Sequence, residues 1–140
     1  MTNVTLAESY LAKAKVRGKM LQFLLGEQAY SDVIREAQEA VELAIKGILR
    51  KIGVEPPKQH DVGYLLLEYR HKFPQEVAEQ VDRLAAISKW LRKEREFSFY
   101  GDIDFIPTLE YTHEDAERAY SDLQVVIEMA EKVIGPKENC

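Results

Sequence analysis

The sequence predicts an all-α protein, an up-and-down bundle of about five helices. Apolar residues recur at three- and four-residue steps in five segments, which is the period of an amphipathic helix. No segment alternates convincingly with period two, and the connections between the periodic segments are short. The chain has 140 residues, of which 46% are hydrophobic and 31% charged, with 7 Gly and 5 Pro. This composition is typical of a helical globular domain, so we expect one domain over residues 1–140, with its core at about 5–135 and a tail at 136–140.

The first two helices are expected over residues 5–26 and 31–53. The sequence TLAE, which begins at Thr5, reads as a capping box that opens the first helix. The second helix has the most regular apolar pattern in the chain, and Gly53 ends it. The members of that pattern are Val33, Ala37, Ala40, Val41, Ala44, Ile45, Ile48, Leu49 and Ile52.

Three more helices are expected after the proline-rich turn that follows Gly53. A short one opens at His60 and Asp61, with Asp61 as its cap, and continues to about residue 69. A long one has Pro74 in its first turn and continues to a loop that begins at Gly101. Its apolar side follows Val77, Val81, Leu84, Ser88, Leu91 and Arg95. The last helix follows the cap-like sequence THED (112–115) and ends at 135–136.

Charge and cysteine content narrow the function classes. The chain has 19 basic and 24 acidic residues, a net charge of −5, so nucleic-acid binding would need a local basic patch. The one cysteine, Cys140, can form no internal disulfide. There is no apolar signal core and no apolar run long enough for a bilayer. We therefore expect a cytoplasmic protein without a membrane partner.

Arg95 is the most unusual residue of the predicted long helix, because it continues an apolar stripe. An arginine there is costly unless it meets a carboxylate, a phosphate or a wet cleft. The alternative is that it lies past the packed region, where a cation complements the helix dipole. Arg92 and Lys93 read as exposed cations of the last turn. Phe97, Phe99 and Tyr100 are typical of a core or an interface, although stacking on bases is an alternative.

Two Glu-x-x-His sequences, Glu68 to His71 and Glu110 to His113, raise the question of a metal. Paired units of this kind build di-iron sites in helical bundles. The second unit straddles an expected helix start, so its spacing does not suit a helix, and we expect no metal and no other cofactor. Glu39, Glu42 and Lys46 are expected on a solvated surface, with Glu42 and Lys46 as an i,i+4 pair.

Residues 35–66, REAQEAVELAIKGILRKIGVEPPKQHDVGYLL, resemble the first half of the HEPN domain, and REFSFYGD at 95–102 adds to the resemblance. The resemblance as a whole extends over about residues 5–135. The family implies a helical bundle that usually forms a homodimer. Many members are metal-independent ribonucleases with an Arg, four to six residues and a His at the cleft between protomers. Others bind RNA or nucleotide without cutting, and many are paired with a minimal nucleotidyltransferase in toxin–antitoxin systems.

The motif transfers to this chain only in part. Its Arg falls on Arg95 and its His position on Tyr100, and registers that start from Arg92 give no histidine either. Histidine titrates near neutral pH, whereas tyrosine has a reference pKa of about 10 and is a poor general acid or base. We therefore expect Arg92, Arg95, Tyr100 and Asp102 to bind RNA or nucleotide, with Arg95 and Tyr100 the only catalytic candidates and cleavage disfavoured.

Two alternatives remain open. The chain could be a divergent metal-independent endoribonuclease in which Tyr100, helped by Asp102, replaces the histidine. It could instead be a structural dimerisation or antitoxin module, in which the aromatic residues are buried and Arg95 pairs with Asp102 or Asp104.

Overall fold

The computed structural model describes residues 3–58 and 62–135, and helices dominate this part of the chain. They are α1 (Asn3–Gly26), α2 (Tyr30–Lys51), α3 (Val62–Glu68), the 3-10 helix η1 (Arg70–Lys72), α4 (Gln75–Ala78), α5 (Val81–Phe99), α6 (Pro107–Glu110) and α7 (His113–Ile134). Between the described residues the β pairing amounts to one isolated bridge, Asp102 with Phe105. The predicted all-α fold class is confirmed.

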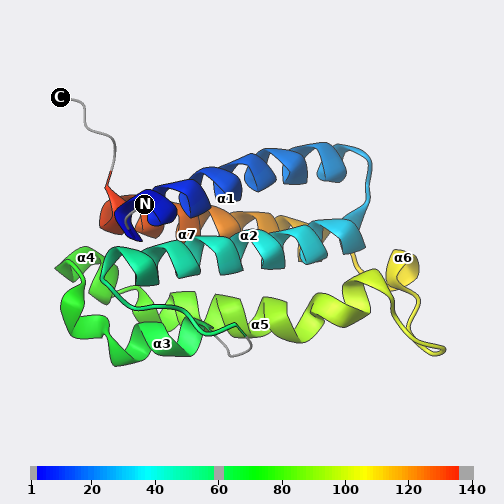
Figure 1. Cartoon of the computed structure of the whole chain (residues 1–140). Coiled ribbons are helices and arrows are strands. Elements are labelled where there is room, and N and C mark those ends of the chain that lie inside the picture. Colours follow the sequence, from blue (N-terminus) through cyan, green and yellow to red (C-terminus); the bar gives the residue numbers. More distant parts are fainter. Residues whose placement is uncertain (1–2, 59–61, 136–140) are drawn as a thin grey trace.

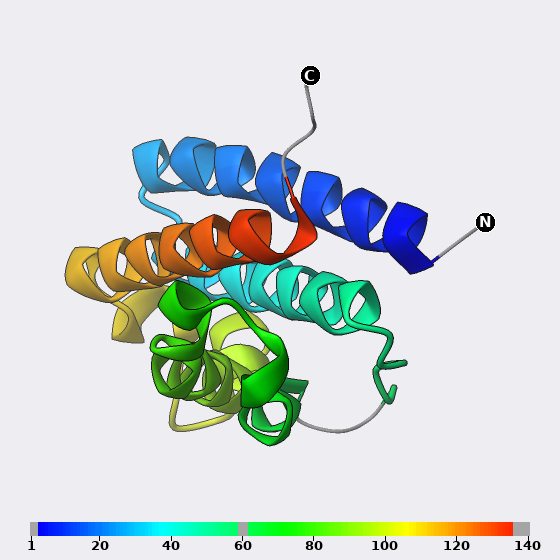
Figure 2. The ribbon, with the colours of Figure 1, turned by 90° about the vertical axis from the view of Figure 1, so that its left-hand side faces the viewer.

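Helix α2 lies at the centre of the bundle and packs against α1, α7 and α5 (Figure 1). Helix α3 packs against α5, and Figure 2 shows α3, α4 and α5 gathered on the side of the bundle that is remote from α1. Twelve of the 22 residues of α2 are buried. The predicted apolar pattern of this helix is confirmed, because every member from Val33 to Leu49 is buried and Ile52 packs partly buried against the core.

Two glycines allow helices to approach each other closely. A Cβ on Gly47 of α2 would lie 3.1 Å from the backbone oxygen of Ala7 in α1 and 3.1 Å from Cδ1 of Ile134 in α7. A Cβ on Gly63 of α3 would lie 2.8 Å from Cβ of Ser88 in α5. Both positions therefore need glycine because a side chain would not fit between the packed helices. The backbone at both is ordinary helix, so conformation is not the reason.

The ends of α7 agree with the sequence prediction. Thr112 Oγ1 accepts a hydrogen bond from the amide of Asp115 at 3.1 Å, and the Asp115 carboxylate accepts one from the amide of Thr112 at 2.9 Å. This reciprocal pair is a capping box. Gly135 follows the last turn with φ of 96°, a left-handed backbone that suits glycine.

Several predicted boundaries are wrong. Helix α1 begins at Asn3, so Thr5 lies inside the helix and is not its cap. The long helix expected from Pro74 is divided into α4 and α5, because the guanidinium of Arg70 donates to the carbonyl of Ala78 at 3.1 Å and to the carboxylate of Asp82 at 2.8 Å. These bonds satisfy a carbonyl at the end of α4 and fix the start of α5.

The predicted cap at Asp61, the neighbouring His60 and the tail at 136–140 lie outside the described residues. No helix within the described ranges combines the length and the apolar character needed to cross a membrane.

Candidate anion-binding groove

The last turns of α5 place two arginines opposite two glutamates of α2. Arg95 Nη2 lies 3.0 Å from Glu39 Oε2, and Arg92 Nη1 lies 3.8 Å from Glu42 Oε1. The arginines are three residues apart on α5 and the glutamates three apart on α2, so each pair lies on one face of its helix. Arg95 therefore meets a carboxylate, one of the three environments that its position in the stripe calls for.

Glu42 is the centre of the polar contacts between the two helices. Its Oε1 accepts a hydrogen bond from Gln38 Nε2 at 2.8 Å, and its Oε2 lies 3.1 Å from Lys46 Nζ. The predicted pair of Glu42 and Lys46 is confirmed. The group is less solvated than expected, since the side chain of Glu42 is 19% exposed and Arg92 of α5 faces it.

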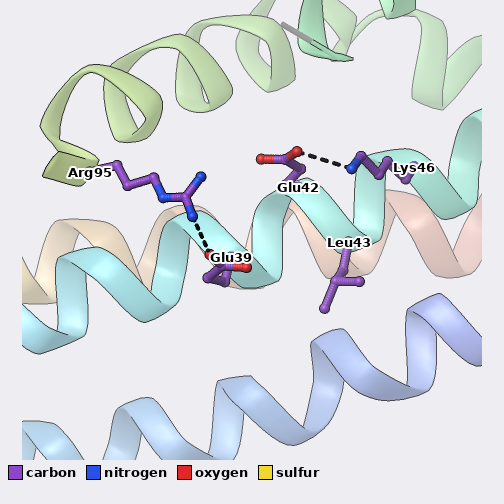
Figure 3. Close-up of a pocket in the computed structure, with 5 residues that line it drawn as sticks. All are labelled: Glu39, Glu42, Leu43, Lys46 and Arg95. Atoms are coloured by element: carbon purple, nitrogen blue, oxygen red, sulfur yellow. Dashed lines mark hydrogen bonds and ion pairs between the residues drawn. The ribbon is translucent and has the colours of Figure 1, made fainter. Parts of the chain in front are cut away.

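These side chains surround a hollow of about 200 Å³ between α2 and α5, which we call the α2–α5 groove. Glu39, Glu42, Leu43, Lys46 and Arg95 line it. Figure 3 shows Arg95 reaching from α5 across to Glu39, while Leu43 points away from the charged side chains. With Arg92, three cations and two carboxylates meet here, so an anionic group that displaces a carboxylate would find cations already arranged around it.

The stripe of α5 does not end at Arg95. Ser98, one turn further on, is 1% exposed, and its hydroxyl donates to the carbonyl of Arg95 at 2.9 Å. The side chain of Arg95 is 44% exposed, so its guanidinium lies at the rim of the interface with α2. Arg95 therefore faces a carboxylate, as the first interpretation requires, but it does not lie past the packed region, because Ser98 beyond it is buried.

Tyr100 and Asp102 belong to a tight turn that follows α5. The amide of Asp102 donates to the carbonyl of Phe105 at 3.0 Å, and the amide of Phe105 donates back at 3.0 Å. Asp102 Oδ1 also accepts from the amide of Asp104 at 2.9 Å. The carboxylate of Asp102 therefore shapes the turn, and the ion pair of Arg95 is made with Glu39 and not with Asp102 or Asp104.

Gly101 makes this turn possible. It has φ of 68°, and a Cβ at this position would lie 2.2 Å from the carbonyl oxygen of Phe105. The backbone thus folds back on itself directly after Tyr100, whose side chain is 73% exposed at the end of the bundle. Of the four predicted binding residues, Arg95 lines the groove, Arg92 lies beside it against Glu42, and Tyr100 and Asp102 belong to the adjoining turn.

An aromatic cluster holds the turn against α5. The ring of Phe105 makes edge-to-face contacts with Phe97 at 5.3 Å and with Tyr111 at 5.5 Å between centroids. The hydroxyl of Tyr111 donates to Glu94 Oε1 at 2.7 Å. Burial raises the pKa of Tyr111 well above its usual value, and the hydrogen bond to Glu94 and the charge of that carboxylate raise it further.

Sequence reasoning missed Glu94 and Tyr111 as supports of the site. The two residues are 17 positions apart and belong to no recognisable motif. The short helix α6 was also missed, although Pro107 at its first position is a typical start signal.

The two Glu-x-x-His sequences do not form helical ligand pairs. Glu68 ends α3 while His71 lies in η1, and Glu110 ends α6 while His113 begins α7. His113 Nε2 instead lies 3.1 Å from the Glu117 carboxylate. Within residues 3–58 and 62–135, no group of three or more His, Cys, Asp or Glu side chains is arranged to hold a metal ion.

Comparison with known protein families finds the HEPN domain. The model of the HEPN domain matches residues 7–133. The match extends far beyond residues 35–66 and confirms the resemblance found there. No curated protein and no solved structure matches the chain.

Proposed function

Because the chain belongs to the HEPN family, we propose that it binds RNA or a nucleotide through the α2–α5 groove and the adjoining turn, without cutting it. One observation carries the proposal: Arg92 and Arg95 share one face of α5 beside a hollow, and the turn with Tyr100 follows directly. Phosphate groups are bound by guanidinium groups in this kind of arrangement. A base or ribose would extend towards Tyr100.

The ion pairs of the groove do not prevent phosphate binding. The side chains of Arg95 and Glu39 are 44% and 36% exposed, and exposed ion pairs stabilise a protein by only about 0–1 kcal/mol. The terminal phosphate of a nucleotide carries nearly two negative charges near pH 7 and offers Arg95 a stronger partner than the single charge of Glu39. A phosphodiester group of RNA carries one charge and competes with Glu39 at equal charge. Glu39 therefore acts as a competitor that a ligand displaces at small cost.

The proposal includes a homodimer that closes the groove. Large apolar side chains gather around the turn and are exposed, with Ile103 at 92%, Leu109 at 75% and Ile106 at 50%. Covering this apolar surface with the same region of a second protomer would remove it from water and bring two sets of arginines together. A homodimer would also match the usual state of the family.

We also propose that this chain has the partner protein and the cellular location that are usual in the family. A minimal nucleotidyltransferase would be its partner in a toxin–antitoxin type of pair, and both would act in the cytoplasm. Binding without cleavage follows from Tyr100 in the position of the motif's histidine, since loss of a general acid or base removes roughly 10²- to 10⁴-fold in rate.

A binding titration with matched variants tests the groove. Fluorescent ATP and a short single-stranded RNA are titrated with the wild type, with Arg95→Ala and with Glu39→Gln. We expect Arg95→Ala to weaken binding about tenfold, equal to about 1.4 kcal/mol, and Glu39→Gln to strengthen it, because the competing carboxylate is gone. Arg70→Ala is the control, since Arg70 pairs with Asp82 at 2.8 Å with a similarly exposed side chain, 40%, near the opposite end of α5.

Opposite outcomes would reject the assignment. Equal binding by the wild type and Arg95→Ala, or equal losses in Arg95→Ala and Arg70→Ala, would remove the groove from the role. Cleavage of the RNA by the purified protein, abolished by Tyr100→Phe, would favour the divergent ribonuclease. Sedimentation as a monomer would contradict the homodimer.

A further inference from the structure

Helix α1 has apolar side chains on two opposite faces. Ala7, Leu11, Ala14 and Leu21 are buried, on the face that packs against α2 and α7. On the outer face, Val16 is 54% exposed, Met20 42% and Phe23 66%. Their spacing of four and three residues places these three side chains in one stripe along the helix, which we call the α1 stripe. The described part of the fold therefore leaves each side chain of the α1 stripe at least 42% exposed.

Basic residues border the α1 stripe. Lys13, Lys15, Arg17 and Lys19 fall within seven residues, and the only acidic residue of α1 is Glu8. The helix therefore carries a formal charge of +3 in a chain of −5, which leaves −8 for the other residues. This is a local charge reversal on an otherwise acidic molecule.

The four cations of α1 differ in the ion pairs and hydrogen bonds that they make within the chain. Lys15 pairs with Glu131 of α7, and Arg17 donates to the carbonyl of Lys13 at 3.3 Å. In the part of the chain that the structure describes, Lys13 and Lys19 take part in no ion pair. Exposed cations without a carboxylate next to an apolar stripe are available to an acidic partner.

The spacing suits a second helix laid along α1. Val16, Met20 and Phe23 take alternate positions of a coiled-coil seam, and Arg17 and Lys19 then take the two flanking positions. In helix pairs of this kind the flanking charges select the partner, and basic residues select glutamate or aspartate.

We propose that the outer face of α1 docks an acidic amphipathic helix of a partner protein. Such a helix would place its apolar side on the α1 stripe and its carboxylates beside Lys13, Arg17 and Lys19. Figure 1 shows α1 and α5 on opposite sides of α2, so this surface is separate from the α2–α5 groove. Both could be occupied at the same time.

Charge disfavours the other occupants of this surface. Two copies packed through their α1 helices would bring like charges together on both sides of the seam. An anionic membrane would repel the charge of −8 on the other residues, and three large apolar side chains offer little surface for insertion. On this surface the apolar α1 stripe separates the cations. Phosphate groups of a nucleic acid laid along α1 would therefore contact apolar side chains, which do not bind them.

A designed peptide tests the proposal. The probe is a fluorescent helix of about three heptads with Leu at the seam and Glu at the flanking positions, and its twin carries Lys instead of Glu. We expect the full chain to bind the acidic peptide at least tenfold more tightly than the basic one. Phe23→Ser should weaken binding about tenfold, and Arg17→Glu with Lys19→Glu should reverse the preference. Tyr64→Ser, at an exposed residue of α3, should leave binding unchanged.

A methionine label locates the contact. The methyl resonance of Met20 should shift when the acidic peptide binds, whereas that of Met129, which is 7% exposed in α7, should not. Equal binding of the two peptides, or a loss in Tyr64→Ser as large as that in Phe23→Ser, would overturn the proposal. So would preferential binding of phosphatidylserine vesicles or RNA by this face, or self-association that Phe23→Ser abolishes.

Discussion

The buried side and the groove side of α2 differ in what holds them to their neighbours. The buried side consists mainly of small and aliphatic residues packed at close distance, as at Gly47. The groove side has Glu39 and Glu42, which contact α5 through ion pairs and enclose a hollow. One helix thus carries both a packed core, on which stability depends, and a charged surface that can exchange its partners. The difference separates residues needed for folding from residues available for binding.

The largest contrast between the two sides should appear when an aliphatic side chain is shortened. Ile48 is fully buried, and Ile48→Ala should lower the free energy of unfolding by about 3–4 kcal/mol through lost burial and a cavity. Leu43 lines the groove and is only partly buried, so Leu43→Ala should cost about 1 kcal/mol. Urea unfolding of both variants measures the difference, and equal losses would show that the groove is packed as tightly as the core.

Replacing Gly101 in the turn beside the groove should destabilise the protein, and the same replacement at Gly53 serves as the control. A Cβ at Gly101 would lie 2.2 Å from the oxygen of Phe105, so Gly101→Ala must open the turn and should cost about 2–3 kcal/mol. Gly53 also has positive φ, 88°, but an added Cβ would meet nothing within 4 Å, so Gly53→Ala should cost only about 1 kcal/mol. Thermal unfolding compares the two, and ligand binding should suffer in Gly101→Ala alone.

The two glutamates of the groove should differ in their contribution to stability. Glu42→Ala removes the acceptor of Gln38 and the partner of Lys46 and Arg92, and should cost about 1–2 kcal/mol. Glu39→Ala removes one exposed ion pair and should cost less than about 1 kcal/mol. Unfolding at low and high salt checks this, because screening should reduce the smaller effect first. A larger loss in Glu39→Ala would contradict the hydrogen-bond pattern of the groove.

The smallest predicted effect is the pH dependence of the contribution that Tyr111 makes to the free energy of unfolding. Its pKa is raised in the folded state above the unfolded value of about 10, so its contribution to stability is complete below pH 10 and is lost as the pH rises beyond that. Tyr111→Phe should cost about 1 kcal/mol at pH 7, and the difference from the wild type should shrink above pH 10. Tyr64→Phe, at an exposed tyrosine of α3, is the control and should follow the wild-type curve throughout.

Part of the candidate site could be predicted from local pattern. The break in an apolar stripe identified Arg95 as a residue that needs a polar partner, and the structure supplies one at 3.0 Å. Which carboxylate would meet it could not be predicted, since Glu39 is 56 residues away and Asp102 and Asp104 were nearer choices. The proposed α1 stripe was hidden for a related reason. Apolar residues lie on two faces of α1, so the sequence shows no single apolar stripe. Only the packing of α1 against α2 and α7 shows which face is buried.

The sequence by itself determined the fold class, the register of α2 and the ends of α7. These depend on interactions within a few residues, namely a 3.6-residue apolar period, a capping box at Thr112 and a glycine at 135. Only the tertiary structure decided that α4 ends where Arg70 caps it, that Glu94 holds Tyr111, and that the arginines of α5 face the glutamates of α2. Those contacts join residues that are neighbours only after the helices have packed, and local periodicity carries no information about them.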